Sequence, residues 1–489
     1  MALTQAEKDL LDRVESRLAI GGEWVEAQEG KTLDVFDPAT GELLKSIADA
    51  SVADAQRALD AAVAAQAEWA KTSPRERSNI LRKAWELLQE RRADFALLMT
   101  IEMGKPLAEA EGEVTYGGEF LRWFSEEAVR VGGRFGSNPE GTADMIVSKI
   151  PVGPCYFITP WNFPLAMATR KIAPALAAGC TVVVKPAALT PLTTIYFQQL
   201  LEDAGLPKGV VNVVATSQSS KQSEALLQDK RLRKLSFTGS TPVGVKLLEA
   251  AAQNVLRTSM ELGGNAPLIV FEDADIDVAV EGILAAKFRN IGQACTAANR
   301  VYVQESIADE VAERLAERVS AMKVGRGTEE GVQIGALVEE KAVANIERLV
   351  DGAVEKGGRV LAGGKRIAGP GCFYQPTVVD YTPLESDLAR EEIFGPVLAI
   401  VRFKTEDEAV ELANDTEYGL ASYVFTENLH RAQRMIDRIE AGMMAVNAGV
   451  LSNAAAPFGG MKQSGLGREG SHEGIEEFLE TKYTMIPRR

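Results

Sequence analysis

The chain has little of what several kinds of functional site require. It holds only two histidines, His430 and His472, in 489 residues, and its four cysteines are widely separated with no CxxC pair. Two histidines cannot supply a multi-histidine metal site, and cysteines spaced in this way suggest neither a zinc cage nor a disulfide framework. The sequence therefore predicts no metal site and predicts that the cysteines are free thiols.

A surplus of basic residues is also missing, because 53 Lys and Arg face 69 Asp and Glu, a net charge of −16. Nucleic-acid binding needs a cationic surface, so we expect no nucleic-acid partner. The longest apolar stretch, 173–184, is interrupted and too short to span a membrane, and the N-terminus lacks the regions of a signal peptide. We therefore expect no membrane partner and a cytoplasmic location.

What the chain does have is a repeated alternation of short apolar runs with helix-like segments. The first series of runs lies at 155–158, 181–185, 210–214, 234–237 and 267–270. Such a βαβ pattern predicts a doubly wound parallel sheet. A second alternating region, 279–445, indicates a second α/β domain, and the first hundred residues are predicted to be mostly helical, at 51–69 and 75–102.

Two glycine-rich segments are candidates for a dinucleotide turn. The segment 235–244 runs from a predicted strand into a glycine turn and then a helix with proline near its start. By spacing alone this signal is weak. The segment 465–470 fits GxGxxG, but the preceding residues 461–464 do not read as a strand, so we do not expect it to hold a pyrophosphate.

Cys295 is the candidate nucleophile among the thiols. It lies in a polar, glycine-containing connection, 288–296, whereas Cys180 lies in an apolar run. Taken alone, Cys295 is better explained as an inert, half-buried thiol than as a nucleophile, since free cysteines usually behave as small hydrophobic residues.

Seven longer motifs decide between these interpretations. They are PWNFP at 160–164, KPA at 185–187, FTGS at 237–240, ELGGN at 261–265, GQAC at 292–295, EEIFGPV at 391–397 and PFGGMKQSG at 457–465. In these motifs and their order, the chain resembles the aldehyde dehydrogenase superfamily over essentially its whole length. The resemblance implies an NAD(P)-dependent aldehyde dehydrogenase.

The resemblance also implies an architecture, in which two doubly wound α/β domains are joined by a small β-arm. Residues 1–127 and 151–261 would form the dinucleotide-binding domain, and 262–469 the catalytic domain with the nucleophilic cysteine. Residues 128–150 and 470–489 would form an oligomerisation arm of a homodimer or homotetramer.

Three residues would carry the chemistry. The Cys295 thiolate would attack the aldehyde carbon to give a thiohemiacetal and then a thioester. Asn162 would donate its side-chain amide to the developing alkoxide, and Glu261 would act as the base that activates water for hydrolysis. Taken singly, Asn162 could be an ordinary turn residue, and Glu261 could simply end a strand.

The resemblance places both NADP and NAD among the expected cofactors. Ala188 stands where many NAD-preferring members have Glu, and the loss of a carboxylate favours a 2′-phosphate, which Ser220 and Lys221 could contact. NADP is therefore predicted to be preferred, although Lys221 could be merely solvated. The predicted cofactor-binding residues are Thr159, Pro160, Trp161, Lys185, Ala187, Ala188, Ser220, Lys221, Phe237, Thr238, Gly239, Ser240, Gly244, Glu261, Leu262, Gly263, Glu392 and Phe394.

The substrate is predicted to be an aldehyde that carries a carboxylate. Arg170 and Arg289 match arginines with which the succinate-semialdehyde-oxidising branch holds the distal carboxylate. Ser452, or its neighbour Asn453, would add a hydroxyl or amide ligand, and Phe458 would line the site.

Four alternatives stay open on the sequence. Both arginines could form surface ion pairs, or the substrate could be glutarate semialdehyde, another semialdehyde or a neutral aldehyde. A coenzyme-A-acylating enzyme is disfavoured by Glu261. A catalytically inactive structural protein on the same fold is disfavoured by the intact Cys295, Glu261 and Asn162.

Ala297 stands where many members of the branch have a second cysteine, which excludes a disulfide between positions 295 and 297.

Overall fold

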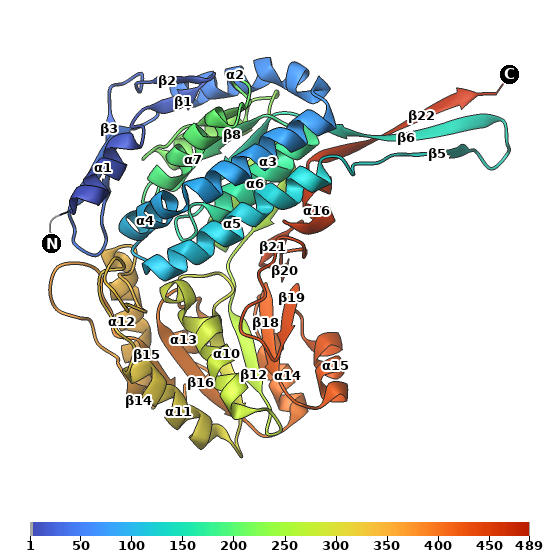
Figure 1. Ribbon diagram of the computed structural model, residues 1–489. Helices are drawn as coiled ribbons and strands as arrows, with labels where there is room; N and C mark the ends of the chain where they lie inside the picture. The colour runs from blue at the N-terminus through green and yellow to red at the C-terminus, as the bar shows by residue number, and fades with distance from the viewer. Residues whose placement is uncertain (1–2, 489) are drawn as a thin grey trace.

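The computed structural model describes residues 3–488, which fold around two large sheets and a projecting arm (Figure 1). Residues 1, 2 and 489, at the ends of the predicted domain ranges, lie outside the described part. Within the described part, no helix is both long and apolar enough to cross a bilayer.

The first sheet has eight strands in the order β2-β1-β9-β8-β7-β10-β11-β21. Its five central strands are parallel, and their side chains are largely buried, as expected for a sheet covered on both faces. The strands are β1 (Leu18–Ile20), β2 (Glu23–Val25), β7 (Cys155–Ile158), β8 (Val182–Lys185), β9 (Val211–Val213), β10 (Lys234–Thr238), β11 (Arg257–Glu261) and β21 (Gly465–Leu466).

The second sheet has seven strands in the order β14-β15-β16-β13-β12-β18-β19, and only the edge strand β14 is antiparallel. The predicted pair of α/β sheets is therefore confirmed, but one strand was assigned to the wrong sheet. The run 267–270, predicted as the last strand of the first sheet, is β12 of the second sheet, and β11, which the apolar pattern did not reveal, takes its place in the first. The chain passes from the first sheet to the second after β11. The strands are β12 (Ala266–Val270), β13 (Ala298–Gln304), β14 (Arg359–Ala362), β15 (Thr377–Asp380), β16 (Val397–Phe403), β18 (Ala421–Phe425) and β19 (Met443–Val446).

The N-terminal region is more helical than the sequence indicated. The predicted helix 75–102 is two helices, α3 (Pro74–Glu90) and α4 (Arg92–Met103), and α5 (Leu107–Glu127) follows as a further long helix that was not predicted. α4 is followed by Gly104, which has a φ of 96°. A Cβ at this position would lie only 2.5 Å from the Ala336 carbonyl oxygen, so the conformation and the close approach both require glycine.

The helices and the short paired strands have the following bounds. The helices are α1 (Gln5–Arg13), α2 (Val52–Lys71), α3 (Pro74–Glu90), α4 (Arg92–Met103), α5 (Leu107–Glu127), α6 (Ala166–Ala178), α7 (Leu192–Asp203), α8 (Ser219–Leu227), α9 (Thr241–Ala252), α10 (Ile276–Phe288), the 3-10 turn η1 (Arg289–Gly292), α11 (Ala308–Ser320), α12 (Glu340–Glu355), α13 (Asp387–Arg390), α14 (Glu406–Asn414), α15 (Leu429–Arg438) and α16 (Ser471–Glu476). The short strands are β3 (Thr32–Phe36), β4 (Leu43–Ala48), β17 (Tyr418–Gly419) and β20 (Met461–Lys462).

The arm consists of three antiparallel strands, β5 (Arg134–Ser137), β6 (Ala143–Pro151) and β22 (Leu479–Pro487). It extends away from the body of the molecule (Figure 1). Its side chains include the exposed hydrophobic residues Phe135, Tyr483 and Met485. α16, which lies in the predicted arm range 470–489, packs instead on α5 and α6 in the body.

Two buried carboxylates fix the starts of helices that border the first sheet. Glu102 on α4 accepts hydrogen bonds from the backbone N–H groups of Leu192 and Thr193, at the start of α7. Glu113 on α5 does the same for the start of α6. Neither α6 nor α7 has a side-chain cap of its own, so these carboxylates satisfy N–H groups that would otherwise have no partner.

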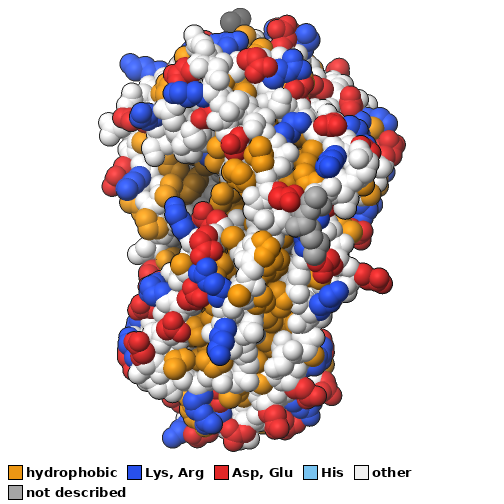
Figure 2. Space-filling model, turned by 90° about the vertical axis from the view of Figure 1, so that its left-hand side faces the viewer, with side chains coloured by type: hydrophobic (Ala, Val, Ile, Leu, Met, Phe, Trp, Pro, Cys, Tyr) orange, Lys and Arg blue, Asp and Glu red, His pale blue; other side chains and the backbone are white. Residues whose placement is uncertain are grey.

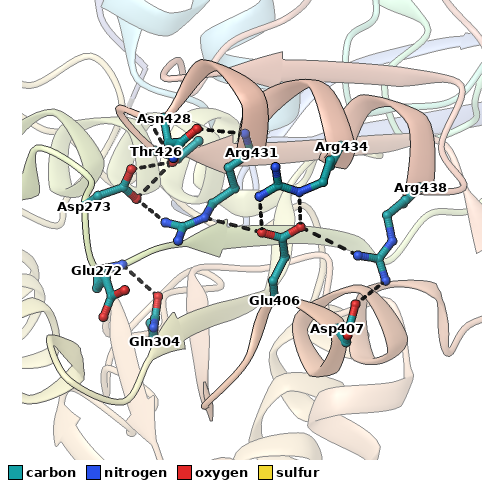
Figure 3. Close-up of polar contacts among 10 residues, drawn as sticks. All are labelled: Glu272, Asp273, Gln304, Glu406, Asp407, Thr426, Asn428, Arg431, Arg434 and Arg438. Atoms are coloured by element: carbon teal, nitrogen blue, oxygen red, sulfur yellow. Dashed lines mark hydrogen bonds and ion pairs between the residues drawn. The ribbon is translucent and has the colours of Figure 1, made fainter.

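Ion pairs fasten the outer helices of the second sheet. Figure 3 shows Arg431 on α15 between Asp273 and Glu406, with Arg434 forming two contacts of 2.6 and 2.7 Å to Glu406. The group is partly exposed, so each pair contributes about 0–1 kcal/mol. The network links α15 to α14, which carries Glu406 and Asp407.

Candidate active site

Three segments bring the predicted catalytic residues together between the two large sheets. Asn162 lies in the loop between β7 and α6, Glu261 ends β11, and Cys295 lies just before β13. A Cβ built at Gly264 would lie 2.7 Å from the Cys295 carbonyl oxygen. Glycine therefore allows the segment after Glu261 to pass directly against the cysteine loop.

Cys295 lies in a half-buried position, whereas Cys155 and Cys180 are buried in the body of the protein. Burial raises the pKa of the Cys295 thiol to about 12, and Arg170 opposes this rise. Glu392 and Glu261 raise the pKa further, and Arg289 lowers it. The protein groups alone therefore keep this thiol largely protonated near neutral pH.

The Asn162 side chain is buried beside the cysteine loop. Its Nδ2 donates a hydrogen bond to the Gln293 carbonyl at 3.0 Å, and its Oδ1 has no partner among the described residues. An amide nitrogen carries two N–H groups, so one remains for another acceptor. This geometry is compatible with the predicted donor role.

Glu261 is 3% exposed, and its Oε2 has no hydrogen-bond partner among the described residues. Burial raises its pKa well above the usual range, and Glu469 raises it further, while Arg170 and Lys171 lower it. A buried carboxyl with a free oxygen is suited to exchanging a proton with a small molecule.

A buried ion cluster, missed in the sequence, lies next to Glu261. Lys171 contacts Glu469 at 2.5 Å and the Ser236 hydroxyl at 2.9 Å, and Arg170 forms an ion pair with the same Glu469. The adjacent cations Arg170 and Lys171 in an apolar helix were the available signal. Glu469 could not be paired with them, because almost three hundred residues separate the partners.

The two predicted substrate arginines differ in their surroundings. The Arg170 guanidinium is buried, held by Glu469, and lies 4.1 Å from the centre of the Phe458 ring. Arg289 is half-buried, lies 5.7 Å from the Phe163 ring, and makes no ion pair within residues 3–488. It lines a cavity of about 500 Å³ together with Glu109, Tyr116 and Phe163. Arg289 is thus the available cation, and Arg170 is already paired.

The remaining predicted substrate residues lie on the segment after β19. Ser452 is half-buried in a loop without regular structure, and Asn453 is exposed, with its Oδ1 accepting from the Ala455 N–H. Phe458 is buried under Arg170 and forms a β-bridge with Glu469. The choice between Ser452 and Asn453 as a ligand stays a prediction.

The residues predicted to hold the adenosine end of a cofactor surround a buried lysine. Lys185 Nζ donates to the Ser219 hydroxyl at 3.3 Å, and burial lowers the pKa of Lys185 to about 8. Ser220 and Lys221 are exposed one and two positions further on. Ser219, which begins α8, was missed because the sequence did not show where this helix starts.

The turn after β10 has glycines at positions where the protein's own side chains pack closely against the backbone. The Gly239 position has no room for a Cβ, which would lie 2.5 Å from the Phe237 ring, and at Gly244 a Cβ would lie 2.4 Å from Leu262. The buried Thr238 hydroxyl has no partner among the described residues. The predicted segment 235–244 therefore has the strand, turn and helix that a dinucleotide turn needs.

The prediction that residues 461–464 include no strand was wrong. They contain the two-residue strand β20, and the next strand, β21, pairs antiparallel with β11 beside Glu261. Antiparallel pairing of two-residue strands leaves almost no periodicity to read. No helix follows until Ser471, so this glycine motif still lacks a helix N-terminus for a phosphate.

The predicted nicotinamide end lies near the cysteine. The Gly264 N–H donates to Glu392 Oε1 at 3.2 Å, and burial raises the pKa of Glu392 to about 7. Phe394 and Trp161 stack edge to face with ring centres 5.3 Å apart. The strand, turn and helix after β10, the Thr238 hydroxyl, unpaired among the described residues, and the two rings together fit a nicotinamide dinucleotide. Within residues 3–488, no group of three or more His, Cys, Asp or Glu side chains could hold a metal ion.

Comparison with known proteins identifies the class. A model of the aldehyde dehydrogenase family matches residues 24–484, and the chain belongs to this family. It is 57% identical over 444 residues to a succinate-semialdehyde dehydrogenase of Paenarthrobacter nicotinovorans, covering 91% of this chain and 99% of that protein.

Two further relatives extend the comparison. The chain is 48% identical over 467 residues to a glutarate-semialdehyde dehydrogenase of Pseudomonas putida, covering 96% of this chain and 97% of the relative. A crystal structure described as an Escherichia coli NADP dependent enzyme superposes with a TM-score of 0.96 at 46% identity, covering both chains completely. The predicted family, fold and enzyme class are confirmed.

The environment of Cys295 predicts a steep pH dependence of its alkylation. With a thiol pKa of about 12, the thiolate fraction in the protein without ligands should rise about tenfold per pH unit between pH 7 and 10. Iodoacetamide labelling of Cys295, followed by peptide mass spectrometry, should show this rise. A rate that levels off near pH 8 would show that the thiol is activated by the protein alone. The Cys295→Ala variant gives the background from the other thiols.

Proposed function

We propose that this enzyme oxidises succinate semialdehyde to succinate with reduction of NADP+ or NAD+. One observation carries the choice of substrate. Arg289 makes no ion pair within residues 3–488, lines a cavity, and lies near enough to Cys295 to lower the pKa of its thiol. A cation near the nucleophile can hold the carboxylate of a short semialdehyde while the aldehyde carbon of the same molecule contacts the Cys295 sulfur.

The first half of the reaction forms a bond to sulfur. The Cys295 thiolate adds to the aldehyde carbon, and the carbonyl oxygen becomes an alkoxide that accepts from the free Asn162 amide N–H. Loss of hydride from that carbon converts the thiohemiacetal into a thioester. A nicotinamide cofactor, when bound, supplies the acceptor for this hydride.

The second half breaks the thioester. Glu261 takes a proton from a water molecule, the water oxygen adds to the thioester carbon, and the C–S bond breaks to release the acid and free Cys295. The raised pKa of Glu261 makes its carboxylate a stronger base than an exposed one, but a smaller fraction of it is ionised at neutral pH. The neighbouring Lys171 lowers the pKa of Glu261, whereas Glu469 raises it.

NADP+ is proposed as the preferred cofactor. Ala188 brings no carboxylate near the adenosine ribose, and the Lys185 ammonium and the Ser219 hydroxyl lie together there, with Ser220 and Lys221 exposed beside them. The solved E. coli relative is described as NADP dependent. Measuring initial rates with both cofactors tests the preference, and a higher kcat/KM with NAD+ would contradict it.

Glutarate semialdehyde is the second candidate substrate, because a relative with 48% identity carries that name. The two substrates differ by one methylene, and pockets discriminate such a difference by about 1–3 kcal/mol. Both would present a carboxylate to Arg289. Comparing kcat/KM for the two semialdehydes decides between them.

A cytoplasmic location remains a prediction from the sequence.

The two halves of the reaction can be separated by substitution. Cys295→Ala should abolish NADPH formation with succinate semialdehyde, because no thiohemiacetal can form. Glu261→Gln should allow one rapid turnover of hydride and then stall, because the amide cannot accept the proton from water. Stopped-flow absorbance should therefore show a burst close to one NADPH per site in Glu261→Gln, and mass spectrometry should find an acyl group on Cys295. Full steady-state activity of Cys295→Ala would overturn the assignment.

Arg289→Met should separate recognition of the carboxylate from the chemistry. The variant should raise the KM for succinate semialdehyde about 10- to 100-fold, the range expected from losing a hydrogen bond to a charged group. The KM for butanal, which has no carboxylate, should change less than about threefold. Arg318→Met, which removes an exposed arginine paired with Glu281, is the matched control. Equal effects on both aldehydes would show that Arg289 does not bind the carboxylate.

We propose that the arm joins subunits in a homodimer or homotetramer. The exposed hydrophobic residues on its strands, and the unpaired edges of a three-stranded sheet, favour association. Tyr483→Asp combined with Met485→Asp should shift sedimentation velocity profiles toward a smaller species. Leu429→Asp, at a 78% exposed position on α15, is the control. Unchanged sedimentation of the arm variant would argue against this interface.

A further inference from the structure

The loop before Cys295 has an unusual backbone. Asn290, Ile291 and Gly292 have φ values of 55°, 61° and 71°, three consecutive residues in the left-handed region. This region suits glycine and is tolerated by asparagine, but it is strained for a β-branched residue such as Ile291. Strained backbone persists where surrounding contacts over-determine it.

The Asn290 side chain supplies the most specific of these contacts. It is fully buried, and its Nδ2 donates to the Asn162 carbonyl at 3.0 Å and to the Gln293 carbonyl at 2.9 Å. The Gln293 carbonyl also accepts from the Asn162 Nδ2 at 3.0 Å. One amide therefore links the backbone of Asn162 to the same carbonyl that Asn162 itself uses.

Lys105 is a second donor to the Asn162 backbone carbonyl. Its side chain is fully buried, and its ammonium donates to the Asn162 carbonyl at 2.9 Å and forms an ion pair with Glu113. Glu113 also accepts from the N–H groups of Leu165 and Ala166. The Asn162 carbonyl is thereby held by two side chains from two distant segments, α10–β13 and α4–α5.

We propose that Asn290 is a positioning residue for the oxyanion donor, with Lys105 as its second support. Asn290 fixes where the free N–H of Asn162 lies relative to Cys295, because both ends of the Asn162 residue are tied to the loop that carries the sulfur. A donor helps only when it lies at the place where the charge develops, so a small displacement is costly for turnover. The inference rests on the proposed function, in which Asn162 donates to the alkoxide.

The Asn290→Gly variant removes the amide with little cost to the backbone, because glycine adopts the left-handed conformation readily. It should lower kcat for succinate semialdehyde about 10- to 100-fold and change KM less than about threefold. The rate of Cys295 alkylation should stay within about twofold, because the thiol itself is untouched.

A double-mutant cycle shows whether the effect passes through Asn162. Asn162→Ala should lower kcat by about 10²–10³, the loss typical of one oxyanion donor. Adding Asn290→Gly to Asn162→Ala should lower kcat by no more than about a further twofold, since there is no donor left to position. Lys105→Met should follow the same pattern, with a lower kcat when Asn162 is present and little further loss in Asn162→Ala. This second cycle keeps the inference testable if an Asn290 variant fails to fold.

Asn447→Gly controls for stability, because Asn447 also has a left-handed φ, 52°, and its amide bonds to the backbone of Thr426. It should leave kcat unchanged. Additive losses in the double variant, or a fall in alkylation that matches the fall in kcat, would overturn the positioning role. Asn162→Ala with unchanged kcat would instead sink the proposed oxyanion role itself, so the two failures are distinguishable.

Discussion

The site depends on ionisable groups that are buried between the two sheets and whose polar atoms are not all hydrogen-bonded. Glu261 keeps one oxygen free, and the nearby ion cluster of Arg170, Lys171 and Glu469 determines the charge around it. An isolated carboxylate would be too costly to bury there, whereas a carboxyl beside paired cations can hold or release a proton at modest cost. The same burial raises the pKa of the Cys295 thiol as well as that of Glu261. Binding of the ligands must therefore change the protonation of the nucleophile and of the base before they can react.

The sheets alone do not bring the residues of the site together. Side chains that cap the starts of helices, and glycines that allow close approach of two segments, also position them. Glu113 caps α6 and is paired with Lys105, which holds the Asn162 carbonyl, so one buried pair orients both a helix and the residue in front of it. Gly264 lets the end of β11 touch the cysteine loop. The alternating sheets could serve many reactions, and these few local contacts bring this set of side chains together.

Much of this could be predicted from the sequence, because motifs and periodicity are local. The alternation of apolar runs predicted that there are two sheets, although it put the run 267–270 in the first sheet instead of the second. The motifs around Asn162, Glu261 and Cys295 placed the candidate residues on the segments that do meet. The remainder depended on contacts between distant residues. Nothing near Lys171 shows that Glu469 lies against it, and nothing near Asn290 shows that its amide reaches Asn162. Helix ends were also imprecise, which is why Ser220 and Lys221 were named and Ser219 was not.

The difference between the two arginines shows why residue type is insufficient for assigning a ligand. Both were predicted to hold a carboxylate, but Arg170 already has one in Glu469, and a second anion would have to compete with a buried ion pair. Arg289 faces a cavity beside the half-buried Glu109, whose pKa burial raises and Arg289 lowers, so the cation is moderated without being paired. Such an arrangement leaves enough positive charge to attract a carboxylate, and the neighbouring Glu109 means that Arg289 is not an isolated cation. Under the proposed function, selectivity for a charged aldehyde would arise mainly from Arg289, while Arg170, paired with Glu469, lowers the pKa of Glu261.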